Sequence, residues 1–291
     1  MIRSIKKYAL LLLVAVLSLS GSTGCRQLIL ENRMDCPTFV FISIDPEGYP
    51  LPQDLDVHLD IHDKLYSTTL LRDTVTAVHL TENGYYAEIG KQEFINVEGI
   101  AGFNGLMRNG EEWIIPDGED GAPYYRFKTS ATATDEQTHV KARFTKEFSR
   151  INIQFVIEGM EFPYNLIAKG NTYGLDLSTG DPLKGTYTYD VPEGRRPGSY
   201  SFIVPRQKDN SLRLELHRKD DYGSTKVGPT NDDPAERIDD IYMWDLLKKI
   251  DGFSWDMENL IDIDIEINYV YSTVTIAVDD WDSVETYEFN M

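Results

Sequence analysis

Apolar and polar residues alternate along much of the chain after residue 38. The clearest two-residue periods occur at residues 54–62, 151–157, 261–268 and 274–278. Because successive side chains of a strand point to opposite faces of a sheet, this period indicates β-strands with one apolar and one polar face. Such strands are typical of antiparallel sheets with one solvated side, and two sheets must pack face to face to bury the apolar rows. The pattern therefore predicts a mainly β protein built from sandwiches.

Only residues 239–250 have strong helical spacing. Two aspartates begin this segment and two lysines end it, which suits the helix dipole. Residues 94–106 are a weaker helical candidate, because three glycines in that stretch favour a loop. Residues 220–237 are polar, contain Gly and Pro, and predict a long exposed loop. We therefore expect one short helix, in the second half of the chain.

The length of 291 residues indicates two domains. We place the boundary near Gly159, so that residues 38–159 form an N-terminal sandwich and residues 160–291 form a C-terminal one. In this division residues 151–157 close the first sandwich, and a new set of strands begins with Phe162. The expected fold class is therefore two tandem antiparallel β-sandwich domains, with the short helix in the second.

The N-terminus has the parts of an export signal. Residues 3–7 contain three positive charges, and residues 8–19 are almost wholly apolar. This apolar run is shorter than the ~20 residues that a membrane-spanning helix needs, so it is interpreted as part of a signal peptide, residues 1–24. No other stretch of the sequence approaches that length.

Small residues lead directly into Cys25, which resembles the lipobox of bacterial lipoproteins. The resemblance implies cleavage between Gly24 and Cys25 and lipid attachment to Cys25. Lipoboxes usually carry Leu three residues before the cysteine, where this chain has Ser22, and the alternative is a secreted protein with an unmodified Cys25. Acylation would make residues 25–37 a tethered segment and would leave Cys36 without a partner in the chain. We expect Cys36 to be a small buried residue, with an intermolecular disulfide as the alternative.

Charge and cysteine content exclude several classes of function. The chain has 28 Lys and Arg against 48 Asp and Glu, which gives a formal charge of -20. Phosphate backbones would repel such a chain, so binding of nucleic acid through a basic face is excluded. Two cysteines exclude both a disulfide framework and a four-cysteine zinc site.

No combination of residues points to catalysis. His58 and His62 would lie about 13 Å apart on a strand, which is too far to share a zinc ion. Acidic clusters such as residues 279–282 lack the spacing of a calcium loop and predict solvated loops, with a weak calcium site as the alternative. No Ser-His or Cys-His pair has sequence support. We therefore expect no catalytic residue, no metal site, no cofactor and no enzymatic activity.

The four tryptophans raise the question of sugar binding. They are Trp113, Trp244, Trp255 and Trp281. Aromatic side chains in sandwiches usually fill cores, and this is the role we expect. A stacking platform for carbohydrate is the alternative.

Several short motifs, taken in order, resemble one protein family. They are Cys25 ten residues before Asp35-Cys36-Pro37, the Gly-Tyr-Tyr strand at 83–89, the strand pair at 143–153, the helix at 239–250 before 261–268, and a strand at 275–281 ending in Asp-Trp. This order resembles the minor fimbrial anchor-subunit family of Bacteroidetes, the FimB-like lipoproteins, over nearly the whole chain after the signal. The resemblance implies two transthyretin-like β-sandwiches, acylation of Cys25 with palmitate among the chains, and no catalysis. It also implies anchoring of a type V fimbria, or pilus, and control of its length.

The expected function is therefore that of a surface-exposed lipoprotein of the cell outer membrane and part of a fimbrium. Its partners would be pilin subunits, bound by strand exchange at an unpaired sheet edge, and the membrane, bound through Cys25. We expect the assembly contact in residues 270–291, because they form a predicted strand pair at a free chain end. The alternatives are a fimbrial tip or cell-adhesion subunit of the same architecture, and a polysaccharide-binding surface lipoprotein.

Overall fold

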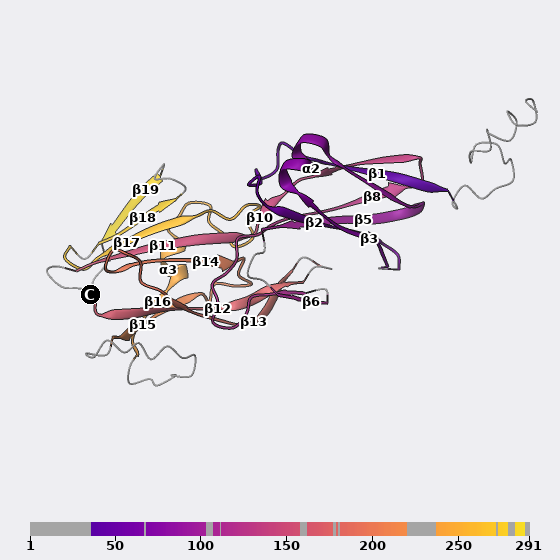
Figure 1. The fold of residues 1–291 in the computed structure, drawn as a ribbon. Helices are drawn as coiled ribbons and strands as arrows, with labels where there is room; N and C mark the ends of the chain where they lie inside the picture. The colour runs from indigo at the N-terminus through magenta and orange to yellow at the C-terminus, as the bar shows by residue number, and fades with distance from the viewer. Residues whose placement is uncertain are drawn as a thin grey trace, which may run out of the picture.

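The computed structural model consists of two β-sandwiches that follow one another along an elongated molecule (Figure 1). The structure describes residues 36–66, 68–102, 107–110, 112–157, 162–176, 179, 181–219, 237–271, 273–278 and 283–288. Each sandwich encloses its own apolar core between two sheets. The predicted mainly β fold with tandem sandwiches is therefore confirmed. Among the described residues, no helix is long and apolar enough to cross a membrane.

The first sandwich packs a three-stranded sheet, of order β4-β1-β9, against a five-stranded sheet, of order β10-β8-β5-β2-β3. The strands are β1 (Pro37–Ile44), β2 (Asp56–Asp63), β3 (Thr69–Thr76), β4 (Tyr85–Gly90), β5 (Gln92–Ala101), β8 (Tyr125–Ala133), β9 (Gln137–Ala142) and β10 (Thr145–Lys146). The predicted alternation at residues 54–62 falls in β2, where Val57, Leu59 and Ile61 are fully buried. Period-two spacing thus places these side chains in the core.

Helix α2 (Ala77–Asn83) joins β3 to β4, and the sequence analysis missed it. The Thr76 hydroxyl accepts a hydrogen bond from the His79 N–H at 3.3 Å, which caps the first turn. Gly84 ends the helix with a φ of 70°, and its N–H donates to the Leu80 carbonyl at 3.1 Å. The helix has seven residues and buries only Ala77 and Leu80, so its apolar period is too short to recognise.

Strand β5 occupies most of residues 94–106, so the weak helix prediction for that stretch is wrong. Gly99 is not a loop residue, because it allows close packing within the sheet. A Cβ on Gly99 would lie 2.1 Å from the Phe127 ring of the neighbouring strand β8. A glycine inside a strand commonly marks such a close approach.

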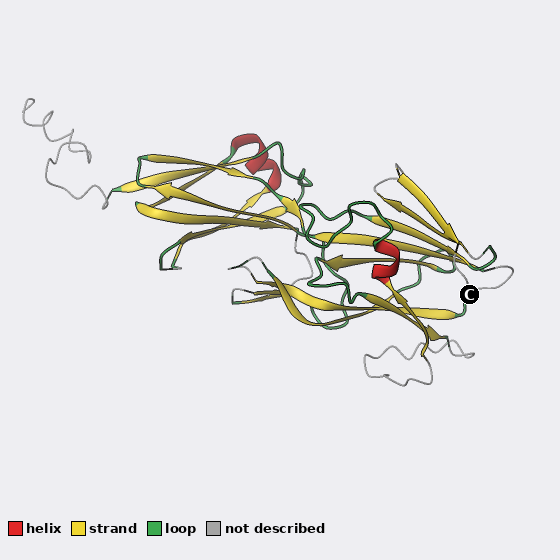
Figure 2. Ribbon diagram, turned by 180° about the vertical axis from the view of Figure 1, so that it is seen from behind, coloured by secondary structure: helices red, strands yellow, loops and turns green. Residues whose placement is uncertain are grey.

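The second sandwich packs a five-stranded sheet, of order β14-β11-β17-β18-β19, against a six-stranded one (Figure 2). The latter has the order β16-β15-β12-β7-β6, with β13 also paired to β12. The strands are β6 (Met107–Asn109), β7 (Glu112–Ile114), β11 (Phe148–Val156), β12 (Tyr164–Asp176), β13 (Pro182–Val191), β14 (Ser199–Pro205), β15 (Arg213–Arg218), β16 (Arg237–Tyr242), β17 (Ile263–Asn268), β18 (Thr273–Val278) and β19 (Ser283–Glu288). Its core includes Phe202, Leu214 and Ile263.

The strand expected to close the first sandwich belongs to the second. Strand β11 pairs antiparallel with β14 and parallel with β17, and its residues Ile151 and Ile153 lie in the second core. The placement of residues 151–157 in the first sandwich is therefore wrong. The chain contributes β6 and β7 to the second sandwich, returns to the first for β8 to β10, and passes to the second for the last time at Glu147. Alternation indicates which face of a strand is buried, but it does not indicate which core receives that face.

The predicted helix at 239–250 is only partly present. Helix α3 (Met243–Leu247) has five residues, and the preceding β16 pairs antiparallel with β15. Met243 and Leu247 are buried in the second core, which fixes this short turn of helix. Residues 239–242, the first four of the predicted helix, are therefore part of a strand, because their pairing with β15 outweighs their helical spacing.

The two sandwiches share one pairing scheme. In each sandwich one strand lies between an antiparallel and a parallel neighbour, since β1 lies between β4 and β9, and β11 lies between β14 and β17. The strand pairs β1–β9 and β11–β17 are thus parallel, which the sequence pattern did not indicate. The structure contains this repeated arrangement although no internal sequence repeat is visible.

Candidate functional site

The outermost hairpin of the second sandwich lies within residues 270–291, the expected assembly contact. Strand β18 pairs with β17 from Ile263↔Val278 to Asn268↔Thr273, and β19 pairs with β18. Val274 and Ile276 of β18 are buried in the core, which fixes the hairpin to the sandwich. Within the described ranges, β19 has a paired strand on one side only. The backbone groups on its other side therefore form a sheet edge that can accept another strand.

The opposite edge of the same sheet, β14, is covered by loop backbone. The Ile203 N–H donates to Asp120 Oδ1 at 2.7 Å, and the Gly121 N–H donates to the Ile203 carbonyl at 3.1 Å. Further along β14, the Gly194 N–H donates to the Ser199 carbonyl at 2.7 Å. These contacts occupy groups that an incoming strand would need, so the two edges of this sheet differ. Burial raises the pKa of the Asp120 carboxyl, although the backbone hydrogen bonds oppose this shift.

The terminal hairpin and the start of β1 lie at opposite ends of the molecule (Figures 1 and 2). The turn between β17 and β18 is held by Asn268, whose Oδ1 accepts the N–H groups of Val270 at 3.0 Å and Tyr271 at 3.2 Å. The side chains of this turn, Val270 and Tyr271, are exposed. A protein held at β1 would thus present its open edge strand far from the point of attachment.

The junction between the sandwiches contains a buried lysine. Lys146 is almost fully buried, and its ammonium donates to Asp262 Oδ1 at 2.7 Å. Its backbone N–H donates to Asn259 Oδ1 at 3.0 Å, and its carbonyl accepts the Leu260 N–H at 3.0 Å. The ammonium also lies 4.8 Å from the centroid of the Phe148 ring. The last strand of the first sandwich is therefore fixed to the segment that precedes β17.

Glu147 and Arg206 form the second part of this junction. Arg206 Nε donates to Glu147 Oε2 at 2.6 Å, and both side chains are largely buried. The guanidinium also donates to the carbonyls of Trp255 and Met257. The backbone adds a bond from the Arg206 N–H to the Glu147 carbonyl at 3.0 Å. Sequence reasoning missed both residues, because a burial-dependent ion pair between distant positions leaves no local pattern.

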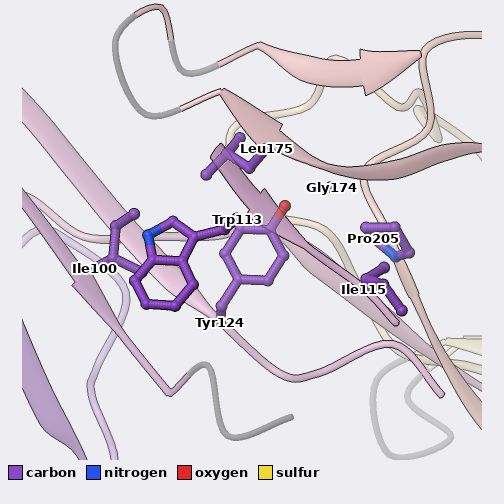
Figure 3. A pocket seen from close by; sticks show the side chains of 7 residues that line it. All are labelled: Ile100, Trp113, Ile115, Tyr124, Gly174, Leu175 and Pro205. Carbon is purple, nitrogen blue, oxygen red and sulfur yellow. The ribbon is translucent and has the colours of Figure 1, made fainter. Parts of the chain in front are cut away.

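Trp113 packs where the two sandwiches meet, so it forms no exposed stacking platform. Its ring forms a buried cluster with Ile100 of β5, Tyr124 and Leu175 of β12 (Figure 3). The cavity among these side chains measures about 10 Å³, which is about the room of one water molecule at most. Because β7 pairs with β12, this tryptophan joins the second sandwich to β5 of the first.

The other tryptophans that the structure describes also form no exposed platform on which a sugar could stack. Trp255 is buried in the second core, and Trp244 is partly buried against it. Trp281 lies outside the described residues. The expected core role is therefore observed for Trp255, and the described tryptophans lie in the interior or at the junction.

The two histidines of β2, His58 and His62, contact different threonines of β3 and do not converge on a common site. His58 Nδ1 lies 3.1 Å from the Thr74 hydroxyl, and His62 Nδ1 lies 3.3 Å from the Thr69 hydroxyl. Burial lowers the pKa of His58, and the nearby Arg108 acts in the same direction. Within the part of the chain that the structure describes, no group of three or more His, Cys, Asp or Glu side chains is arranged to hold a metal ion.

The predicted lipid site is not covered by the structure. Gly24 and Cys25 lie outside the described residues, as do the acidic residues 279–282. Cys36 is described, directly before β1, and it is half-buried rather than fully buried. Acylation of Cys25 and cleavage after Gly24 therefore stay predictions.

Comparison with known proteins identifies the fold. No protein-family model matches the sequence, and no curated protein matches it. Solved structures match over most of the chain. The fimbrial anchor protein Mfa2 from Porphyromonas gingivalis is 11% identical at a TM-score of 0.59, covering 84% of this chain and 98% of that one. The tandem sandwiches therefore have the fold of a Bacteroidetes fimbrial protein, as the sequence resemblance predicted.

Two proteins from Bacteroides thetaiotaomicron have similar structures. A proposed polysaccharide-binding protein is 13% identical at a TM-score of 0.60, covering 88% of this chain and 98% of that one. A proposed adhesin is 11% identical at a TM-score of 0.57, covering 90% of this chain and all of the other, 100%. At these identities the likeness concerns the fold, and this chain shares it with fimbrial and adhesin-like proteins.

Proposed function

We propose that this protein is a lipoprotein of the outer membrane that anchors a fimbria to the cell surface and limits its length. The observation that carries the proposal is the edge strand β19, which among the described residues pairs on one side only, in a chain with the fold of a fimbrial anchor protein. The order of sequence motifs supports the same role. In this proposal residues 1–24 are the signal peptide and residues 25–37 are the tethered segment. The first sandwich ends at Glu147, and the earlier strands β6 and β7 belong to the second sandwich.

The assembly contact would be made by strand addition at β19. An incoming pilin strand would pair with the backbone N–H and C=O groups on the side of β19 that faces away from β18. The covered β14 edge favours β19 as the acceptor within this sheet. One chain would thereby connect the polymer to the membrane, since Cys25 and β19 belong to opposite ends of the chain.

Two proline variants test the edge. In an antiparallel pair, backbone N–H groups of alternate residues point toward the neighbour and away from it. Substitution of Glu285→Pro and of the adjacent Thr286→Pro therefore removes one N–H that faces β18 and one that faces outward. We expect the variant that lacks the outward-facing N–H to fold normally and to release fimbriae into the medium. Deletion of residues 282–291 should also release fimbriae. Unchanged attachment in both the deletion and the outward variant would refute the contact at β19.

Palmitate labelling tests the tether separately. Cells producing the wild-type chain or Cys25→Ala would be fed a palmitate analogue and then treated with an external protease. Label on the wild-type chain that is absent from the variant, together with cleavage by the protease, is the expected result. An unlabelled wild-type chain would remove the membrane anchor from the proposal.

The rival functions give different results. A tip or adhesin subunit predicts that deletion of the gene leaves fimbriae attached but reduces adhesion. A polysaccharide-binding lipoprotein predicts binding to a glycan array that is lost in Trp281→Ala or Trp113→Ala. The burial of Trp113 at the junction argues against a direct role for that side chain in binding sugars.

A further inference from the structure

Several exposed apolar side chains gather at the end of the first sandwich where β1 begins. The register places Pro37 beside Gly90, and the Lys64 N–H donates to the Phe94 carbonyl at 3.1 Å. The turn after β2 and the starts of β1 and β5 therefore lie at the same end of the sandwich, away from the second sandwich (Figure 1). The exposed apolar residues beside this turn, here called the β1-end patch, are Leu65 at 62% exposure, Tyr66 at 79% and Phe94 at 40%.

The turn of the β1-end patch is held in place by a buried carboxylate. Asp63 Oδ1 accepts the N–H of Leu65 at 2.7 Å and the N–H of Tyr66 at 2.9 Å. Asp63 itself is buried, so its carboxylate is fixed beneath the turn. The backbone of the turn is thus tied down while the two apolar side chains extend into solvent. Exposed apolar side chains held in this way are typical of a contact surface.

The length of the preceding chain indicates what lies opposite the patch. Eleven peptide units join Cys25 to Cys36, and at ~3.6 Å each they span about 40 Å when fully extended. An acylated Cys25 would therefore keep the β1-end patch close to the bilayer at all times, at a high effective concentration. Tyrosine is suited to the membrane interface, where its ring meets lipid and its hydroxyl meets water, and leucine adds a wholly apolar contact.

We propose that the β1-end patch rests on the lipid surface, as a second contact beside the acyl chains. This inference rests on the proposed lipid anchor and adds a contact made by the folded protein itself. The charges at this end are mixed, since Lys64 and Lys91 are accompanied by Glu93 and Glu136. The contact is therefore apolar and does not require anionic lipid, so zwitterionic vesicles are the appropriate probe.

A fluorescent probe at each end of the molecule tests the contact. In a Cys36→Ser background, Tyr66→Cys would be labelled with an environment-sensitive fluorophore, and the acylated chain would be placed in phosphatidylcholine vesicles. Tyr271→Cys is the matched control, because Tyr271 is 74% exposed in a turn that Asn268 holds in the same manner at the opposite end. We expect a blue shift at residue 66 and loss of its emission when the vesicles contain brominated lipid, with neither change at residue 271.

A second arm separates this contact from the lipid anchor. The mature chain, with a hexahistidine tag in place of residues 1–25, would be tethered to phosphatidylcholine vesicles that contain a nickel-chelating lipid. The probe at residue 66 should again be quenched by brominated lipid, and Leu65→Ser with Phe94→Ser should restore its emission. Absence of palmitate on Cys25 would defeat the proposed anchor but leave this arm valid.

Three results would overturn the proposal. Equal emission from the probes at residues 66 and 271 on tethered chains would show that the patch does not meet lipid. A blue shift at residue 66 in the soluble chain at low concentration would show that residues 26–35 cover the patch. A blue shift that grows with protein concentration in the absence of vesicles would assign the patch to a second copy of the chain.

Discussion

Arg206 and Glu147 form a largely buried ion pair, with Nε and Oε2 separated by 2.6 Å, at the residue where the chain passes for the last time from the first sandwich to the second. Glu147 belongs to the connection between β10 and β11, and Arg206 directly follows β14. The pair therefore joins the residue that leads into β11 to the end of β14, an edge strand of the same sheet.

Removal of the guanidinium should strongly destabilise the protein. Arg206→Ala leaves the Glu147 carboxylate buried without its ion-pair partner, and we expect a loss of about 3–5 kcal/mol in the free energy of unfolding. Urea denaturation measures this loss. The control is Arg143→Ala, which removes an exposed ion pair with Glu258 and should have a much smaller effect, because exposed ion pairs are screened by solvent and contribute little. Equal effects of the two substitutions would show that the Arg206 pair does not stabilise the fold.

A methyl group at Gly174 should force β7 away from β12. A Cβ at this position would lie 2.1 Å from the Trp113 carbonyl oxygen, whose backbone is held by strand pairing. We expect Gly174→Ala to cost about 1–3 kcal/mol, as overpacked substitutions do. Near-UV circular dichroism should also change, because Trp113 packs at the junction. In Gly90→Ala the added methyl meets only the end of a flexible Gln92 side chain at 4.0 Å, and this variant should be neutral or slightly stabilised.

Asp120 should give the stability a specific pH dependence. Because burial raises the pKa of this carboxyl in the folded state, the folded chain holds its proton to a higher pH than the unfolded chain does. The contribution of Asp120 to stability is therefore greatest below its unfolded pKa and is lost as pH rises through its folded pKa. In Asp120→Asn an oxygen can still accept the Ile203 N–H without carrying charge. We expect the variant to gain stability relative to wild type as pH rises from about 4 to 7.

Urea denaturation at several pH values measures this difference. Asp117→Asn, in the exposed part of the same loop, controls for the change in net charge. A constant difference between Asp120→Asn and wild type across the range would contradict the assignment of the shift to Asp120.

A cavity in the first core should affect mainly the first sandwich. Phe144 is almost fully buried and meets the Phe127 ring edge-on at a centroid distance of 4.8 Å. We expect Phe144→Ala to cost about 3–5 kcal/mol. Hydrogen exchange followed by mass spectrometry should show the loss of protection concentrated in β1, β5 and β8. Leu65→Ala, at an exposed turn, should leave the exchange pattern unchanged.

The alternation of side chains predicted the fold class but not the membership of the sheets. Strand β2 was recognised as a strand and lies where its period requires. Strand β11 was also recognised, yet it joins the second core, because an apolar face carries no information about its partner. The sequence pattern likewise does not indicate the partner of β7, which pairs with β12 through Trp113 and Leu175, two residues far apart along the chain. Short helices such as α2 are missed by sequence analysis for a different reason, since two buried residues do not define a period.

Less of the candidate site could be predicted. The terminal strand pair was expected from its place at the chain end, but the position of β19 at an edge depends on long-range pairing of the whole sheet. The junction could not be anticipated at all. Lys146 and Asp262 are separated by 116 positions in the sequence, and nothing near either residue indicates that the lysine is buried. The prediction for Cys25 rests on local sequence alone and is unaffected by the fold.

The place of β1 in its sheet determines how the protein responds to mechanical force. β1 is flanked on both sides, with six paired positions toward β4 and six toward β9. Tension between residue 36 and Glu147 would pull β1 along its own axis, so that the backbone hydrogen bonds on both sides are sheared together instead of being opened one at a time. A central strand of this kind resists extension far better than an edge strand pulled sideways. The first sandwich is therefore built to transmit a pull along the molecule without unravelling from its N-terminal end.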